Sequence, residues 1–160
     1  MAHPRMAEVE RPAERPEGRG AAPGALATLA PATHAVLRIG AAALFTQHGA
    51  QKLFGWLGGL GGTPGETAPL VSLMGLAGTL EFFGGLLVLL GLLTRAVALI
   101  LAAEMGVAYA IAHLPRGGWP IENQGELALL YAAVFLFLAG NGSGPASLDR
   151  QWRLDPGPAA

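Results

Sequence analysis

The sequence predicts an all-α integral membrane protein, a four-helix bundle with both termini in the cytoplasm. Hydrophobic residues make up 52% of the 160 residues and charged residues only 13%, about half the charged content of an average soluble domain. Four apolar runs approach or reach the roughly 17 to 25 residues that a membrane-spanning helix needs. The stretch 82 to 94 carries no charge on any face, whereas a helix of a soluble bundle has a polar face.

Length and composition exclude several classes of protein. A chain of 160 residues is expected to form one domain. Its net charge of −1 gives no general attraction to nucleic acid, so we expect no nucleic-acid partner. Because there is no cysteine, disulfides, thiolate nucleophiles, cysteine-ligated zinc and cysteine-held iron–sulfur clusters are excluded. Any redox chemistry must therefore use a bound cofactor.

The chain begins with a polar segment, residues 1 to 31, in which Pro, Gly, Arg and Glu alternate without periodicity. This composition is typical of a disordered tail, and it lacks the apolar core of a signal peptide. Residues 32 to 150 are expected to form the membrane domain, followed by a cytoplasmic tail at 151 to 160. The apolar runs of this domain cover about residues 34–56, 70–93, 96–113 and 124–140.

These runs should be helices, because backbone groups in lipid must be hydrogen-bonded within the segment. Gly- and Pro-rich loops separate them. Lys and Arg concentrate on cytoplasmic loops, which sets the predicted orientation. The predicted cytoplasmic side carries Arg5, Arg11, Arg15, Arg19, Arg95, Arg150 and Arg153, and the opposite side carries Lys52 and Arg116.

The first predicted helix has a polar face. At 100° per residue, Arg38, His48 and Lys52 fall within an arc of roughly 80°. Glu81 lies near the middle of the second helix with Gly78 and Gly85 on the same face. Such glycines let another helix backbone approach closely.

The third and fourth helices add two more carboxyl groups. Glu104 lies near the middle of the third helix, roughly opposite a strip of small residues spaced by four, so this helix is expected to pack on two sides. Glu126 opens the fourth helix, where the helix dipole favours an acid. The small-residue strip consists of Ala98, Ala102, Gly106 and Ala110.

Alternating helix directions predict a ladder of charges across the bilayer. His48, Lys52, His113 and Glu126 lie toward the extracytoplasmic side, Glu81 and Glu104 lie deeper, and Arg38 lies toward the cytoplasm. An ionised side chain at the bilayer centre costs about 2.5 to 3.5 kcal/mol or more, so these groups should face the bundle interior.

Purely structural roles remain open for several of these charges. Lys52 and Glu126 could form only an interhelical ion pair, and Arg38 could only extend to the headgroups. His113, at a helix end, is expected to lie at the membrane interface. A haem between His48 and His113 has no support from sequence spacing, so we expect neither haem nor a metal site.

Several motifs in order resemble the DoxX family of small bacterial four-helix membrane proteins. They are HGAQKLFG (48–55), GTLEFFGGLLVLLGLLTR (78–95), EMGVAYAIAHLP (104–115), NQGELALLYAAVFLFLAG (123–140) and GPASLDR (144–150). The resemblance covers about residues 36 to 150. It implies a multi-pass protein of the bacterial cytoplasmic (inner) membrane linked to oxidoreductase chemistry. The family is named after the small subunit of an archaeal thiosulfate:quinone oxidoreductase, and relatives are associated with redox-defence complexes.

Carried onto this chain, the polar motif positions of the family are His48, Lys52, Glu81, Glu104, Asn123 and Glu126. The first hypothesis is a membrane subunit of a quinone-linked oxidoreductase that works with other subunits. In it, His48, Lys52 and Asn123 contact a quinone headgroup or an anion, and the carboxyl groups of Glu81, Glu104 and Glu126 carry protons. In this hypothesis, hydrogen bonds from His48 and Lys52 would stabilise the negative charge that develops on a quinone oxygen during reduction.

Two other hypotheses stay open. The protein could be a non-catalytic membrane anchor or assembly partner that docks through its small-residue strip and its Gly-rich second helix. It could also be a small transporter or channel lined by the charge ladder, although four short helices without inverted repeats do not favour transport. Whether the chain has enzymatic activity of its own is not decided by the sequence.

Overall fold

The computed structural model describes residue 24 and residues 27 to 154, and within this part of the chain every regular element is a helix. Most of the predicted disordered tail, residues 1 to 23 and 25 to 26, and the end of the predicted C-terminal tail, from residue 155, lie outside the described residues. Residues 27 to 31 of the predicted disordered tail are helical, so that prediction extended too far along the chain. The elements are η1 (Ala27–Leu29), α1 (Ala30–Phe54), η2 (Leu60–Gly62), α2 (Leu73–Thr79), η3 (Leu80–Gly84), α3 (Gly85–Leu90), α4 (Thr94–Ala108), η4 (Tyr109–His113), η5 (Leu114–Arg116), α5 (Pro120–Asn123), α6 (Glu126–Asn141) and α7 (Leu148–Gln151).

Three continuous helical stretches are long and apolar enough to cross a membrane. They are Ala27–Phe54 with 28 residues, Leu73–Leu90 with 18 and Thr94–Arg116 with 23. The fourth apolar helix, α6, has only 16 residues. At 1.5 Å per residue it is about 24 Å long, short of the roughly 30 Å hydrocarbon core. A fourth crossing therefore stays a prediction.

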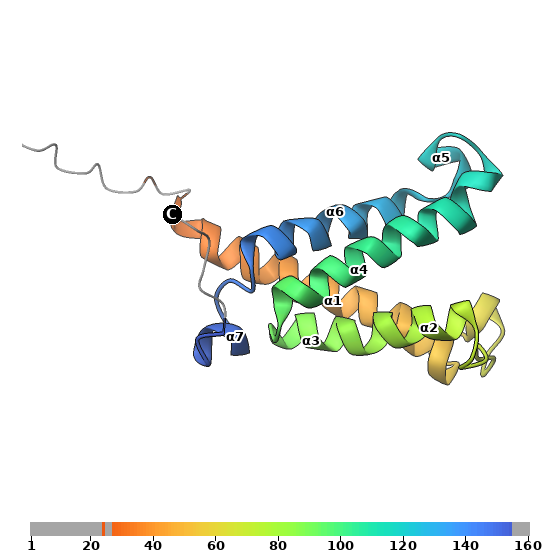
Figure 1. Cartoon of the computed structure of the whole chain (residues 1–160), viewed down its shortest axis with the longest axis horizontal. Coiled ribbons are helices and arrows are strands. Elements are labelled where there is room, and N and C mark those ends of the chain that lie inside the picture. Colours follow the sequence, from red (N-terminus) through yellow and green to blue (C-terminus); the bar gives the residue numbers. More distant parts are fainter. Residues whose placement is uncertain (1–23, 25–26, 155–160) are drawn as a thin grey trace, which may run out of the picture.

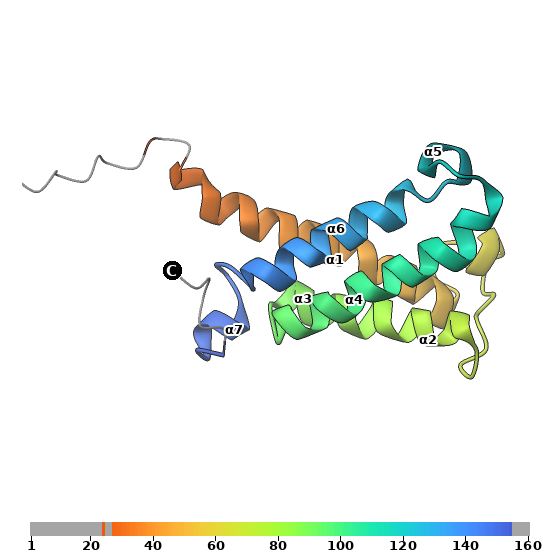
Figure 2. The ribbon, with the colours of Figure 1, turned by 45° about the horizontal axis from the view of Figure 1, so that its top comes forward.

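The long helices form two packed pairs. α1 packs along the second stretch, α2–η3–α3, while α4 packs along α6. The pairs are joined at the short turn between α3 and α4, and they diverge toward the end that carries α2 and α5 (Figures 1 and 2). The start of α1 and the short helix α7 both lie at the opposite end (Figure 1).

Glycines bring α1 against the second helical stretch. A Cβ atom on Gly49 would collide with the backbone of Phe82, and one on Gly85 would collide with the side chain of Thr46. A Cβ atom on Gly78 would lie 2.8 Å from Cβ of Lys52. The close approach predicted for Gly78 and Gly85 is confirmed, and Gly49 of α1 contributes to it from the facing helix.

An apolar layer fills the middle of the bundle. Phe45 packs its ring against Phe135 at 4.7 Å between ring centroids. Val88, Leu101, Phe135 and Leu138 are fully buried, and Phe45 is 1% exposed. These side chains come from all four long helical stretches, so the layer separates the two ends of the molecule.

Arg38 anchors the end near α7. Its side chain is fully buried, and its guanidinium donates hydrogen bonds to Val88 O at 2.9 Å, Leu89 O at 2.6 Å and Ala146 O at 2.7 Å. The predicted role of extending to the lipid headgroups is therefore wrong. Arg38 instead satisfies carbonyls at the C-terminal end of α3 and in the segment that leads to α7.

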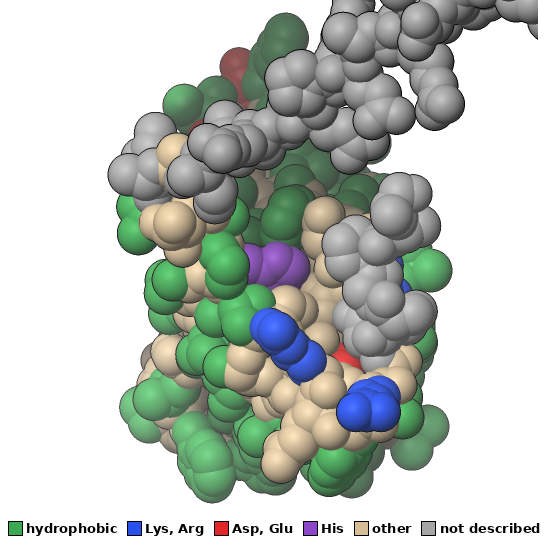
Figure 3. Space-filling model, turned by 90° about the vertical axis from the view of Figure 1, so that its left-hand side faces the viewer, with side chains coloured by type: hydrophobic (Ala, Val, Ile, Leu, Met, Phe, Trp, Pro, Cys, Tyr) green, Lys and Arg blue, Asp and Glu red, His purple; other side chains and the backbone are tan. Residues whose placement is uncertain are grey.

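Asp149 secures the same end. Its carboxylate accepts hydrogen bonds from the backbone N–H of Leu93 at 2.7 Å and of Thr94 at 2.9 Å, which are otherwise unpaired donors at the start of α4. Figure 3 looks onto this end, where basic side chains lie among polar atoms and hydrophobic side chains cover the flanks.

The small-residue strip of α4 has two different environments. Ala98 is fully buried and Ala102 is 6% exposed, on a helix that packs along α6. Gly106 and Ala110 are exposed, and a Cβ atom on Gly106 would meet no atom within 4 Å. Only the half of the strip near the α3–α4 turn is therefore covered within the described chain.

Candidate functional site

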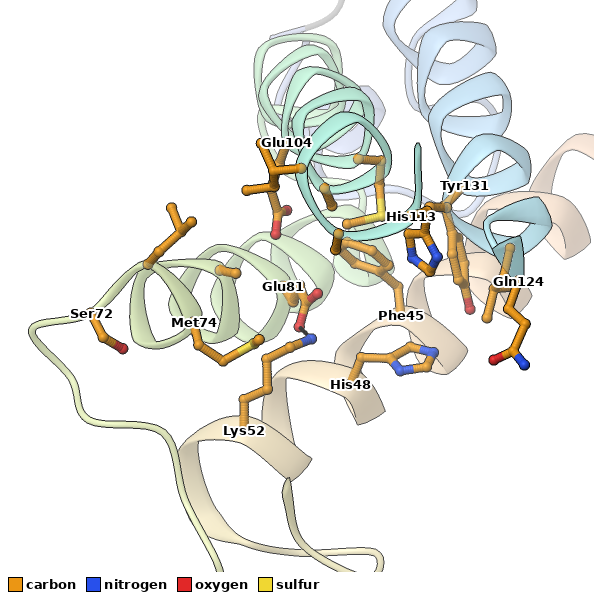
Figure 4. Close-up of a pocket in the computed structure, with 18 residues that line it drawn as sticks. Phe45, His48, Lys52, Ser72, Met74, Glu81, Glu104, His113, Gln124 and Tyr131 are labelled. Carbon is orange, nitrogen blue, oxygen red and sulfur yellow. Dashed lines mark hydrogen bonds and ion pairs between the residues drawn. The ribbon is translucent and has the colours of Figure 1, made fainter. Parts of the chain in front are cut away.

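A cavity of about 610 Å³ lies between the two helix pairs, at the end where they diverge (Figure 4). Most of its lining is hydrophobic, and the polar side chains come from α1, η3, α4, η4 and α6 and from the residues that cap α2 and α5. The polar or titratable lining residues are His48, Lys52, Ser72, Glu81, Glu104, His113, Gln124 and Tyr131. A concave, mostly apolar site with a few convergent polar groups is typical of a small-molecule site.

Lys52 and Glu81 form an ion pair across the cavity wall (Figure 4). The Lys52 side chain is 17% exposed and the Glu81 side chain 5%. The sequence had suggested Glu126 as the partner of Lys52, and this pairing is not observed. Lys52 reaches Glu81 because the glycines Gly49 and Gly78 bring the two backbones close together beside it.

Glu81 lies in a single turn of π-helix, η3, within an otherwise α-helical stretch. A π turn inserts one extra residue and rotates the side chains that follow, and such turns are frequent at functional sites. The second π turn, η4, carries His113 to the opposite wall of the same cavity. Each of these two π turns therefore places a titratable side chain in the wall of the cavity.

Glu104 is the carboxyl group without a partner. Both of its carboxyl oxygens are buried, and neither accepts or donates a hydrogen bond within the described chain. Figure 4 shows the side chain pointing from α4 into the cavity toward Glu81. Lys52, the only Lys or Arg among the lining residues, is paired with Glu81. A buried polar group without a partner costs about 1 to 3 kcal/mol.

His48 and Tyr131 form the wall opposite Glu104. The Tyr131 ring lies edge-on to His48 at 6.1 Å between centroids and edge-on to Phe45 at 4.9 Å. Neither the imidazole of His48 nor the phenol of Tyr131 hydrogen-bonds to another described residue. Both groups can therefore bond a molecule in the cavity.

Asn123 lies behind the cavity wall and does not line it. It is 1% exposed, and its amide donates to Gly117 O at 2.8 Å and accepts from the N–H of Gly125 at 2.8 Å. Its backbone carbonyl lies 3.1 Å from Nδ1 of His113. Asn123 thus shapes the loop and orients His113, while its predicted contact with a ligand has no geometric support.

Glu126 is exposed at the first turn of α6 and does not line the cavity. Of the residues predicted from the sequence, the structure brings together His48, Lys52, Glu81 and Glu104, and it leaves out Asn123 and Glu126. It adds His113, which was expected at the interface. It also adds Tyr131, the single polar side chain between Leu127 and Asn141, which could have marked this position in the sequence.

The described part of the chain contains no group of three His, Asp or Glu residues that could hold a metal ion. The cavity instead offers one paired cation, two imidazoles, a phenol and a buried carboxyl group. These groups can donate hydrogen bonds to neutral or anionic oxygen atoms and can take up or release protons.

Comparisons with known proteins agree with this architecture. The sequence model of the DoxX family matches residues 33 to 114. An uncharacterized protein of Haemophilus influenzae (strain ATCC 51907 / DSM 11121 / KW20 / Rd) is 40% identical over 124 residues, which cover 74% of this chain and 89% of that protein. No solved structure matches the chain.

Proposed function

Since the chain belongs to the DoxX family of membrane proteins, we propose that it is a membrane subunit of a quinone-linked oxidoreductase in the bacterial cytoplasmic membrane. The cavity is the proposed site of the quinone headgroup. Electrons would come from another subunit, because the chain has no cysteine with which to hold an iron–sulfur cluster.

The residues of the cavity fit a quinone ring. Its volume of about 610 Å³ lies within the roughly 300 to 1,000 Å³ of small-molecule sites. A quinone carries two carbonyl oxygens on opposite sides of a flat apolar ring, and it takes up two electrons and two protons when it is reduced. His48 and Tyr131 could donate to one oxygen from one wall, with the Glu104 carboxyl reaching the other from α4. Phe45 supplies an aromatic face.

The observation that carries the proposal is the unpartnered carboxyl group of Glu104. Apolar packing would stabilise the bundle better than a buried acid with no hydrogen bond. The Glu104 carboxyl group destabilises the protein when the cavity is empty. Its presence is explained if a ligand in the cavity forms the missing hydrogen bonds. The protonated acid would donate to a ligand oxygen and pass on its proton as negative charge develops there.

Lys52 and Glu81 have a different proposed role. Their ion pair keeps a positive charge beside the ligand, and Glu81 can exchange a proton with Glu104 through a water or a ligand oxygen. His113 stands on the η4 wall, next to a loop that leads out of the membrane segments. It would connect this proton route to the aqueous side.

The apolar layer supports a binding site more than a passage across the membrane. Val88, Leu101 and Leu138 are fully buried and do not line the cavity, and Arg38 bonds the backbone carbonyl of Val88. A transported polar solute or ion would have to cross this layer without a polar partner. This layer therefore disfavours transport, and the experiment below distinguishes a non-catalytic anchor from a quinone-binding subunit.

The test is to purify the protein from native membranes in mild detergent, to identify the proteins that accompany it, and to extract and quantify bound quinone. We expect oxidoreductase subunits and quinone with the unaltered chain. Glu104→Gln should lower quinone content and quinone-dependent turnover, while Glu126→Gln, an exposed matched control, should change neither. Unaltered turnover of the Glu104→Gln complex would favour a non-catalytic anchor, and a quinone-free cavity would refute the proposal.

A further inference from the structure

The rim of the cavity is apolar and lies on the side of the bundle. Leu73, Met74 and Ile111 all line the cavity, yet they are 63%, 45% and 53% exposed. Lining residues with this much exposure mark where the cavity meets the exterior. Leu73 and Met74 belong to α2 and Ile111 to η4, which are parts of membrane-spanning stretches. The exterior at this point is therefore lipid rather than water.

The second and third helical stretches touch near their connecting turn and separate farther on. At Gly84 a Cβ atom would lie 2.9 Å from the side chain of Leu101. Toward α2 the two stretches diverge (Figures 1 and 2), and the side chains of Ala77 and Ala112 that line the cavity from the two sides are small. On this side the cavity is therefore bounded by apolar side chains of α2 and η4, and the space between them is called the gap below.

The floor of the cavity has the opposite character. Lys52, Glu81 and Glu104 lie together there (Figure 4). The Lys52 and Glu81 side chains and the carboxyl oxygens of Glu104 are much less exposed than the rim residues. A molecule that matches this change from charged floor to apolar rim has a compact polar head for the floor and a hydrocarbon tail for the rim. Each buried CH₂ group is worth about 0.8 kcal/mol, so a long tail stays in lipid rather than in water.

Resting on the proposed function, we propose that the ligand is a quinone with a long prenyl tail that reaches the cavity from the bilayer through the gap between α2 and η4. The headgroup passes between Ala77 and Ala112, and the tail remains in the gap against Leu73, Met74 and Ile111. This assigns the substrate to the lipid-borne quinones and excludes water-soluble quinones as its natural class.

Photolabelling of the unaltered protein in lipid nanodiscs tests the path of the tail. The probe is a prenylated benzoquinone with a photoreactive diazirine on its tail, and labelled residues are identified by mass spectrometry. We expect labels on Leu73, Met74 and Ile111 that excess unlabelled prenylated quinone removes. Labels on Leu127, the exposed lining residue of α6, that excess unlabelled quinone removes would place the tail beside α6 and overturn the proposal.

Narrowing the gap tests the same proposal by binding. Ala77→Trp and Ala112→Trp should weaken binding of a decaprenyl benzoquinone about tenfold or more, and they should weaken binding of a tail-less benzoquinone less, because only the tailed ligand fills the gap once it is bound. Ala103→Trp, on an exposed position of α4 that does not line the cavity, is the matched control. Ala77→Leu and Ala112→Leu give a milder obstruction should a Trp variant fail to fold.

The outcomes separate the two proposals. If the unaltered protein binds neither the tailed nor the tail-less quinone, the proposed function fails and this inference fails with it. If the tail-less quinone binds but the tailed quinone does not, the headgroup site stands and the path through the gap is wrong. Equal binding of the tailed quinone to all variants would also overturn the path and leave the proposed function intact.

Discussion

Replacing Glu104 by Met should make the protein more stable and less active. In the described structure both carboxyl oxygens of Glu104 are buried without a hydrogen-bond partner. Methionine has a similar length and no group that needs a partner, so the penalty of about 1 to 3 kcal/mol for the unsatisfied carboxyl is removed. For a domain of this size, that gain corresponds to a rise of roughly 2 to 4 °C in melting temperature for each kcal/mol.

The measurement is thermal unfolding of the quinone-free protein in detergent, followed by circular dichroism, beside quinone binding by the same samples. Glu104→Met is expected to melt at a higher temperature and to bind less quinone. Glu126→Met is the control, and it should lose at most about 1 kcal/mol through the helix dipole and keep its quinone. A loss of several kcal/mol in Glu104→Met, as for a large-to-small core substitution, would show that Glu104 has a structural partner and refute the reasoning.

Three further predictions concern the stability of the bundle. Lys52→Met or Glu81→Leu alone leaves a charged partner unpaired and should lower the free energy of unfolding by about 3 kcal/mol, whereas the double variant Lys52→Met/Glu81→Leu should recover most of this loss. Additive losses in this double-mutant cycle would contradict a direct pair. Gly49→Ala should lower the free energy of unfolding by about 1 to 3 kcal/mol, because the added Cβ would collide with the Phe82 backbone. Gly106→Ala has open space around it and should raise the free energy of unfolding by up to about 1 kcal/mol. Chemical denaturation measures both changes. Asp149→Ala removes the cap of α4 and should lower the free energy of unfolding by about 1 to 2 kcal/mol. Quinone binding should stay unchanged, since the apolar layer separates Asp149 from the cavity. A loss of quinone binding would mean that the two ends of the bundle are coupled.

Helical periodicity accounts for much of the site. His48 and Lys52 lie one turn apart, so their placement on one face of α1 follows from the sequence alone, and the structure confirms that both line the cavity. Gly78 and Gly85 likewise predicted that another helix approaches Glu81 closely, and α1 does so. These are local patterns whose three-dimensional meaning depends only on the regular geometry of a helix.

The choice of partners depends on irregular geometry and could not be predicted. Lys52 meets Glu81 rather than Glu126 because η3 is a π turn and because Gln124, with φ at 60°, ends α5 before α6 begins. A single residue of register decides whether Glu126 faces the cavity or the exterior. The role of Arg38 stayed open in the sequence because its carbonyl partner Ala146 lies 108 residues away in the chain.

The contacts of Arg38 have a consequence for biogenesis. The first helix is inserted long before residues 145 to 149 leave the ribosome, and two of its guanidinium hydrogen bonds, to Pro145 O and Ala146 O, await that last segment. Until then this cation lacks two of its hydrogen bonds within the bilayer, which costs free energy. Docking of residues 145 and 146 onto Arg38 is therefore a late step in assembly of the bundle, and a chain that lacks them would leave these two hydrogen bonds unmade.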